Sequence, residues 1–263
     1  MTKSPEIRIP ANEITVAKRT EASIAVVGNP NSGKSTLFNR LTGLKQRIGN
    51  YPGVTVEKHV GYLKTDAAMV ELVDLPGTHS LSAHSLEEHI AVDVIFGRID
   101  GTQAPDGILA VLDATNLYQG LFLVQQLVDL ELPMIVALTL TDAAEKSGIQ
   151  VDTAALSALL GVPVYPVVAT TGAGLEMLRR AIGGIKEIEP PRRIRVWPEL
   201  TEAAAEVAED AHERLRFAEL ERLLIDGPTA ANEAIVAKLS DHGRSRIDDV
   251  RAALFGDEPP IAR

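Results

Sequence analysis

The sequence predicts an α/β fold with a mostly parallel sheet, followed by a small all-α part. Between residues 22 and 189, short apolar runs typical of strands alternate with segments whose apolar residues recur at helical spacing. These runs lack strict apolar–polar alternation, which indicates a sheet covered on both faces. A phosphate-binding sequence follows the first run, and beyond the proline pair at 190–191 only helical patterns occur. These observations predict a nucleotide-binding α/β domain before a helical one.

Composition sets outer limits on function. The 263 residues, 45% of them hydrophobic, suffice for a full core and a small second domain. The absence of cysteine excludes disulfides and thiolate metal sites. A net charge of −10 argues against a nucleic-acid-binding surface, so no nucleic-acid partner is expected. The sequence contains no run of about eighteen uncharged apolar residues, which is the length that a bilayer-spanning helix requires.

The expected domain plan has four segments. Residues 1–21, charged and containing Pro5 and Pro10, are interpreted as a flexible leader without the apolar stretch of a secretory signal. We expect a nucleotide-binding domain at 22–189, a helical domain at 190–256 and a tail at 257–263.

The first element contains the strongest motif. An apolar strand at 24–27 leads into Gly-Asn-Pro-Asn-Ser-Gly-Lys-Ser at 28–35, and a helical pattern follows. Strand, glycine-rich turn and helix are the context of a phosphate-binding P-loop, whose backbone N–H groups and helix N-terminus attract anions. Lys34 is expected to reach the β- and γ-phosphates, and the Ser35 hydroxyl is expected to bind Mg²⁺.

The next elements lead to a second motif. Residues 43–57 are rich in polar and turn residues, so we expect no regular structure there. Short strands are expected at 59–63 and 69–73, with a turn at Thr65-Asp66. The second strand ends at Asp74, 40 residues after Lys34 (74 − 34), where a P-loop protein keeps its Mg²⁺-side aspartate. Gly77 can turn the backbone toward a γ-phosphate.

The remaining elements continue the alternation. Strands are expected at 108–112, 134–138 and 164–168, and helices at 87–99, 117–130, 153–160 and 175–188. Ligands bind at the carboxyl ends of such strands. We therefore expect four distant segments to meet at one edge of the sheet: Gly28, Asp74, 139–142 and 169–171.

Beyond residue 191 we expect three amphipathic helices. The first follows the stripe Leu200, Ala204, Val207, Ala211, Leu215 and Ala218, and it ends at Asp226-Gly227-Pro228. The second carries Ala231, Ile235 and Leu239 and ends at Gly243, and the third carries Ile247, Val250 and Leu254.

Four motifs together resemble the cytosolic GTPase part of the bacterial ferrous iron transport protein B (FeoB) family. They are GNPNSGKS at 28–35, GNYPGVTVE at 49–57, DLPGTHS at 74–80 and the run DATNL at 113–117. The resemblance covers about residues 23–256. It implies a P-loop, Ras-like GTPase fold and a guanine-dissociation-inhibitor-like helical domain that tunes nucleotide release. It also implies a following transmembrane iron permease, a place at the cytoplasmic face of the bacterial inner membrane, and regulation of Fe²⁺ uptake. The resemblance is also compatible with an oligomer.

The resemblance implies a role for each motif residue. Lys34, Thr55 and Gly77 would be catalytic, with Thr55 in switch I (residues 45–57) and Gly77 just before switch II (residues 78–88). Mg²⁺ would be held by Ser35, Thr55 and Asp74. The expected contacts to GTP or GDP are Asn29, Asn31, Ser32, Gly33, Lys34, Ser35, Thr36, Thr55, Asp74, Gly77, Thr139, Asp142, Ala169, Thr170 and Thr171.

A potassium site is a further implication of the resemblance. Asn31 matches the asparagine that helps to hold K⁺ in potassium-activated relatives, and backbone carbonyls near Gly49 and Tyr51 would complete the site. The cation would then stabilise charge as an arginine finger does. The alternative is that Asn31 only stabilises the turn.

Two departures from the pattern limit these implications. Thr78 replaces the water-orienting glutamine of Ras-type enzymes, so slow intrinsic turnover is expected. His79 is the nearest side chain that could assist, although an inert loop histidine is the favoured interpretation. At the base end, Thr139 replaces an asparagine while Asp142 keeps the carboxylate that pairs with guanine. We expect retained guanine preference with affinity weaker by about one hydrogen bond, ~0.5–1.5 kcal/mol.

Other interpretations remain. An iron site on His79, His84, Glu87, Glu88 and His89 is conceivable, but a solvated surface explains this cluster better. The chain could instead be a ribosome- or tRNA-assembly GTPase, which usually carries a basic RNA-binding element, or a regulatory module that binds nucleotide without hydrolysis.

Overall fold

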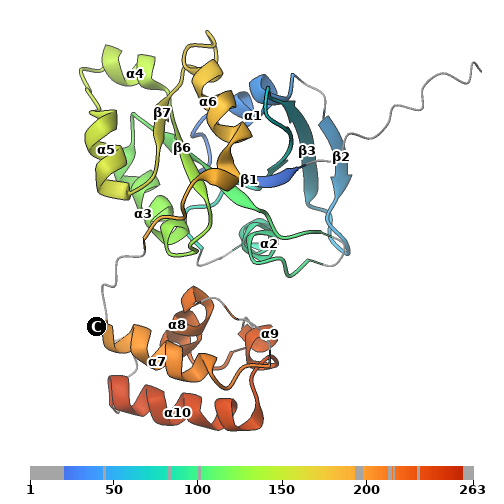
Figure 1. Ribbon diagram of the computed structural model, residues 1–263, viewed down its shortest axis with the longest axis vertical. Helices are drawn as coiled ribbons and strands as arrows, with labels where there is room; N and C mark the ends of the chain where they lie inside the picture. The colour runs from blue at the N-terminus through green and yellow to red at the C-terminus, as the bar shows by residue number, and fades with distance from the viewer. Residues whose placement is uncertain are drawn as a thin grey trace, which may run out of the picture.

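A computed structural model describes residues 21–43, 46–81, 85–99, 102–192, 198–212, 215, 217–229 and 232–256. The expected leader, apart from Glu21, and the whole expected tail lie outside these residues. A sheet with helices on both faces is followed by a group of helices alone, which confirms the predicted fold class (Figure 1).

The sheet has seven strands in the order β2-β3-β4-β1-β5-β6-β7. Strands β4, β1, β5, β6 and β7 run parallel, whereas β3 is antiparallel to both β2 and β4. Their bounds are β1 (Ala22–Gly28), β2 (Gln46–Asn50), β3 (Glu57–Lys64), β4 (Met69–Asp74), β5 (Gly107–Asp113), β6 (Met134–Thr139) and β7 (Val164–Pro166).

Two hydrophobic cores lie on the two faces of the sheet. Along β1, Ile24 and Val26 face a core shared with α1 and α6, whereas Ala25 and Val27 face a core shared with α2, α3 and α5. This two-sided burial explains why the strands are apolar throughout. The helices of this part are α1 (Lys34–Thr42), α2 (Leu86–Ile95), α3 (Leu117–Val128), α4 (Thr141–Lys146), α5 (Thr153–Leu160) and α6 (Leu175–Gly183).

The strand register aligns the carboxyl ends of the central strands. Val26 is opposite Asp74 in the β1–β4 pair, and Gly28 is opposite Val111 in the β1–β5 pair. In the β5–β6 pair, Asp113 is opposite Thr139. The loops after β1, β4, β5 and β6 therefore leave the sheet at one edge, as the sequence predicted for the segments at Gly28, Asp74 and 139–142.

Some local expectations for this part were wrong. The polar stretch 43–57 contains β2, which is exposed along almost its whole length because an edge strand needs backbone pairing rather than apolar side chains. The short helix α4 was not expected. Residues 175–188 form α6 and a separate 3₁₀ turn (Ile185–Glu187) instead of one helix, and α2 ends before Gly97, whose φ is 66°.

The helical part also differs from expectation. Its apolar stripe is divided between two helices, and Gly243 lies within the last helix instead of ending the second. A Cβ on Gly243 would come 2.8 Å from the Cβ of Asp210, so glycine here permits close packing. The helices are α7 (Pro198–Ala208), α8 (Phe217–Asp226), α9 (Glu233–Val236) and α10 (Asp241–Phe255), around a separate core.

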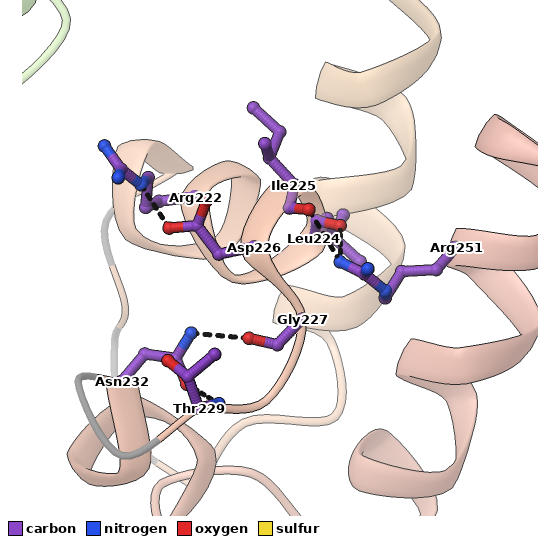
Figure 2. A network of polar contacts seen from close by, with 8 residues as sticks. All are labelled: Arg222, Leu224, Ile225, Asp226, Gly227, Thr229, Asn232 and Arg251. Carbon is purple, nitrogen blue, oxygen red and sulfur yellow. Dashed lines mark hydrogen bonds and ion pairs between the residues drawn. The ribbon is translucent and has the colours of Figure 1, made fainter. Parts of the chain in front are cut away.

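Polar contacts close the end of α8. The Arg251 guanidinium of α10 donates to the carbonyl oxygens of Leu224 and Ile225, as Figure 2 shows. The Asn232 amide donates to the Gly227 carbonyl at 2.7 Å and its oxygen accepts from the Thr229 N–H at 2.8 Å. Side chains thus satisfy backbone groups where the helix ends.

An ion pair joins the sheet part to the helical part. The Arg98 guanidinium, just after α2, lies 2.6 Å from the Glu219 carboxylate of α8 and 3.5 Å from that of Asp93. Its guanidinium carbon is 4.6 Å from the centre of the Phe96 ring. Beside these residues lies a hollow of about 350 Å³ between α2 and α3 on one side and α8 and α9 on the other.

Candidate functional site

The loop between β1 and α1 has the backbone shape of a P-loop. Asn31 and Gly33 have φ values of 64° and 81°, in the left-handed region that asparagine and glycine tolerate best. A Cβ on Gly28 would lie 2.8 Å from the carbonyl oxygen of Val111. Glycine at position 28 therefore permits close contact with β5. Asn29 and Ser32 are buried, whereas Asn31, Ser35 and Thr36 are exposed.

Lys34 and Asp74 form an ion pair across the P-loop. The Lys34 ammonium lies 2.5 Å from a carboxylate oxygen of Asp74, with side-chain exposures of 10% and 13%. The structure thus brings together the two charged groups that the sequence assigned to phosphate and Mg²⁺. The exposed Ser35 hydroxyl lies in the first turn of the same helix. An ammonium, a hydroxyl and a carboxylate are suited to a Mg²⁺-bound phosphate, so these residues fit the group.

The start of switch II lies directly on the P-loop. The Thr78 N–H donates to the Gly28 carbonyl at 3.2 Å. A Cβ on Gly77 would be 3.1 Å from the backbone nitrogen of Pro30, so position 77 favours glycine for its close approach. The Thr78 side chain is completely buried, and its hydroxyl donates to the Ser80 carbonyl at 2.6 Å. A buried hydroxyl engaged in this way is poorly placed to orient a water molecule.

The expected site residues of switch I lie in strand β2 and in the segment that follows it. Thr55 is exposed, and Gly49 lies in edge strand β2, opposite Lys58 of β3. The Tyr51 carbonyl accepts a hydrogen bond from the Val54 N–H at 3.3 Å. Of the expected potassium ligands, Asn31 lies in the P-loop, whereas Gly49 and Tyr51 both lie in switch I.

Tyr51 has a buried hydroxyl. Its side chain is 1% exposed within the core formed with α2 and α3, and its hydroxyl has no hydrogen-bond partner among the described residues. Burial and, second, the negative charge of Asp74 raise the pKa of this hydroxyl above its ordinary value. The sequence analysis considered only the Tyr51 carbonyl and missed this feature.

Thr139 binds the P-loop backbone. It is 1% exposed, and its hydroxyl lies 2.6 Å from the Ser32 carbonyl oxygen and 3.1 Å from that of Leu112. The hydroxyl therefore connects the end of β6 to the P-loop and to β5. The sequence analysis had considered Thr139 only as a base contact.

The two loops expected to contact the base follow β6 and β7. Leu140 has a φ of 54°, and after this turn Asp142 lies in the first turn of α4, partly exposed and 4.0 Å from the Lys146 ammonium. The Arg40 guanidinium of α1 donates to the Thr170 carbonyl in the other loop. Thr170 and Thr171 are exposed and Ala169 is half-buried.

A small polar hollow adjoins the P-loop. It measures about 230 Å³ and lies between the P-loop and the start of α3, with lining residues that include Asn29, Asn31, Asp113, Asn116 and Gln119. The sequence analysis used the run at 113–117 only for its resemblance. An asparagine and a glutamine three positions apart at a helix start were the available signal.

The cluster considered for iron gives no compact ligand set. Among the described residues, no group of three or more histidine and acidic side chains is arranged to hold a metal, and His84 lies outside those residues. The His89 imidazole contacts the Ser85 carbonyl at 2.8 Å. Within the described part of the chain, no helix combines the length and apolarity that crossing a membrane requires.

Comparisons with known proteins agree with this geometry. The family model described as "Ferrous iron transport protein B" matches residues 22–182. The Fe(2+) transporter FeoB of Shigella flexneri is 48% identical over 171 residues, which are 64% of this chain and 22% of that protein. The chain thus spans about a fifth of the length of the curated relatives it matches.

Solved structures extend the likeness to the helical part. The cytosolic domain of the T. maritima FeoB iron transporter in a GDP form has a TM-score of 0.71 and 31% identity, covering 88% of this chain and 92% of that one. Its GMPPNP form has a TM-score of 0.72 and 31% identity, covering 88% and 93%.

Proposed function

The chain belongs to the ferrous iron transport protein B family, and we propose that it acts as the GTP-hydrolysing switch of a ferrous-iron transporter. The observation that carries this proposal is the meeting of the P-loop, the Asp74–Gly77 segment and the Thr139–Asp142 segment at one edge of the sheet. Relatives have been solved in GDP and GMPPNP forms, which supports a guanine nucleotide as the ligand.

At the phosphate end, the proposed reaction is in-line attack of water on the γ-phosphate of GTP. Lys34 would leave Asp74 to stabilise negative charge on the phosphates, and the Gly77 N–H would donate to the γ-phosphate. Backbone groups of switch I and Thr55 would position the water. Mg²⁺, when bound through Ser35, Thr55 and Asp74, would neutralise charge on the β- and γ-phosphates. Thr55 is exposed, so its hydroxyl is free of the core to meet the Mg²⁺-bound phosphates.

At the base end, Asp142 would accept hydrogen bonds from guanine, and backbone N–H groups of 169–171 would donate to the guanine oxygen. The Thr139 hydroxyl is already engaged by the Ser32 carbonyl, which supports a weaker base contact than asparagine provides. Changing Thr139 to asparagine, whose amide can donate to the Ser32 carbonyl in place of the hydroxyl, is expected to lower the Kd for GDP about three- to tenfold. An unchanged Kd would refute the assignment.

Potassium stimulation is also proposed, with Asn31 as a ligand. The exposed side chain of Asn31 beside the phosphate loop supports it. The carbonyls of Gly49 and Tyr51 would have to join Asn31 when switch I rearranges.

In the whole transporter, this chain would lie at the cytoplasmic face of the bacterial inner membrane. Its helical part, 190–256, would regulate nucleotide release, and its partner would be the iron-permease domain. The nucleotide state would reach the permease domain through an order–disorder change of switches I and II on hydrolysis.

Turnover and binding assays test the proposal. GTP hydrolysis with Mg²⁺ is measured in KCl and in NaCl, together with the Kd for GDP and ADP. We expect slow turnover, faster in KCl, and strong preference for GDP. Lys34→Ala should abolish turnover, whereas Lys64→Ala, at an exposed position, should not. Zero turnover in every salt would favour a non-hydrolysing module, and tight RNA binding would favour an assembly GTPase. Fe²⁺ uptake by the full-length transporter with the same two substitutions tests the link to transport.

A further inference from the structure

His79 contacts two elements besides its own loop. Its ring nitrogen Nδ1 lies 3.1 Å from the Asn29 amide nitrogen of the P-loop and 3.1 Å from the Gln119 amide nitrogen of α3. The two partners are 50 and 40 residues away in the sequence. Three segments of the nucleotide site thus meet at one imidazole nitrogen.

The chemistry of these contacts defines their direction. An amide NH₂ group only donates, so Nδ1 is the shared acceptor for both amides. The orientation of Gln119 is fixed from its other side, because its amide oxygen accepts from the Asn116 amide at 3.0 Å. Turning the Gln119 amide over would break that bond.

The neighbouring backbone shows what this contact does. Immediately before His79, the Thr78 N–H is bonded to the Gly28 carbonyl, and Gly77 packs against Pro30. The His79 N–H itself lies 3.3 Å from a Glu88 carboxylate oxygen at the start of α2. The bonds of His79 therefore complete a series that holds residues 77–79 on the P-loop.

We propose that His79 is a positioning residue that fastens the start of switch II to the P-loop and to α3, so that the Gly77 N–H is already placed for a γ-phosphate. This inference rests on the proposed function. Its benefit is preorganisation, because less backbone freedom is lost when GTP binds. GDP has no γ-phosphate, so its binding affinity should depend much less on this preorganisation.

The test compares variants that remove the acceptor or one donor. His79→Phe keeps a ring and removes the acceptor, and Gln119→Leu removes one donor. His242→Phe, at an exposed position of α10, is the matched control. We measure the Kd for a non-hydrolysable GTP analogue and for GDP, and amide hydrogen exchange of residues 77–81 without nucleotide.

The expected results separate fastening from general stability. His79→Phe should weaken binding of the GTP analogue about tenfold and binding of GDP less than twofold. It should also speed amide hydrogen exchange of residues 77–81. Gln119→Leu should give a smaller change in the same direction, and the double variant should match His79→Phe. If His79→Phe does not fold, the same affinity and exchange measurements on Gln119→Leu test the proposal.

Two outcomes would overturn the inference. One is unchanged exchange at 77–81 with analogue affinity within twofold of wild type. The other is equal weakening of GDP and the analogue. Failure of the proposed function is distinguishable, because a wild-type chain that never hydrolyses GTP would still show faster exchange in His79→Phe.

Discussion

Replacing Thr139 with valine tests whether its hydroxyl holds the P-loop in place. Valine keeps the branched shape in a site that is 1% exposed, and it removes the donor that lies 2.6 Å from the Ser32 carbonyl. Packing is therefore almost unchanged, and the effect comes from the lost hydrogen bond.

The magnitude follows from what the substitution leaves behind. The hydroxyl has one proton, so the bond to Ser32 dominates over the 3.1 Å contact with the Leu112 carbonyl. Leaving a buried acceptor without its donor costs about 1–3 kcal/mol. We expect the free energy of unfolding of the nucleotide-free protein to fall by this amount. We also expect the Kd for GDP to rise about three- to tenfold, because the loosened P-loop must be ordered on binding.

The assay is urea denaturation together with titration of fluorescent GDP. Thr229→Val is the matched control, because this threonine is exposed and uses its backbone N–H in the contact with Asn232. A Thr139→Val protein within about 0.5 kcal/mol of wild type in stability, with unchanged GDP affinity, would refute the reasoning.

Three further predictions concern Tyr51 and Arg98. Tyr51→Phe removes a buried hydroxyl without a partner among the described residues, so the free energy of unfolding should rise by about 1 kcal/mol in thermal or urea denaturation; a loss of stability would contradict this. Because folding raises the pKa of Tyr51 above 10.0, the native state keeps a proton that the unfolded chain releases. Wild-type stability should therefore fall as the pH rises above about 10, more steeply than that of Tyr51→Phe. For the Arg98–Glu219 ion pair, with exposures of 21% and 9%, a double-mutant cycle with alanine should give a coupling of about 1.5–3 kcal/mol. A coupling below about 0.3 kcal/mol would exclude the pair as a link between the two parts.

The sequence predicted the central strands and the phosphate end well, because both depend on local signals. Buried strands such as β5 and β6 are continuous apolar runs, and a P-loop needs glycine where the backbone turns, as at Gly33. Strand β2 was missed because its stability comes from pairing with β3, which leaves no apolar pattern. In the helical part, Gly243 suggested a helix end, whereas the structure uses its small size for packing against Asp210.

Two site contacts that the sequence did not predict are long-range. His79 was expected to be inert, and nothing local indicates its contact with Gln119, 40 residues away. The Thr139 hydroxyl was assigned to the base, and its bond to Ser32 spans 107 residues. Spacing identifies which residue types lie at the sheet edge, and packing decides which of them bind one another.

The left-handed turn at Leu140 has a consequence for how this protein can change over evolution. Leucine at a φ of 54° is a conformation that costs of order 1 kcal/mol or more, and it lies between Thr139 and the helix carrying Asp142. The turn thus gives up stability to fix the direction of the base-side loop. Substitutions that relax it should be easy to select for thermal tolerance and should tend to reduce nucleotide affinity. Position 140 is therefore a place where selection for heat resistance and selection for nucleotide binding would act in opposite directions.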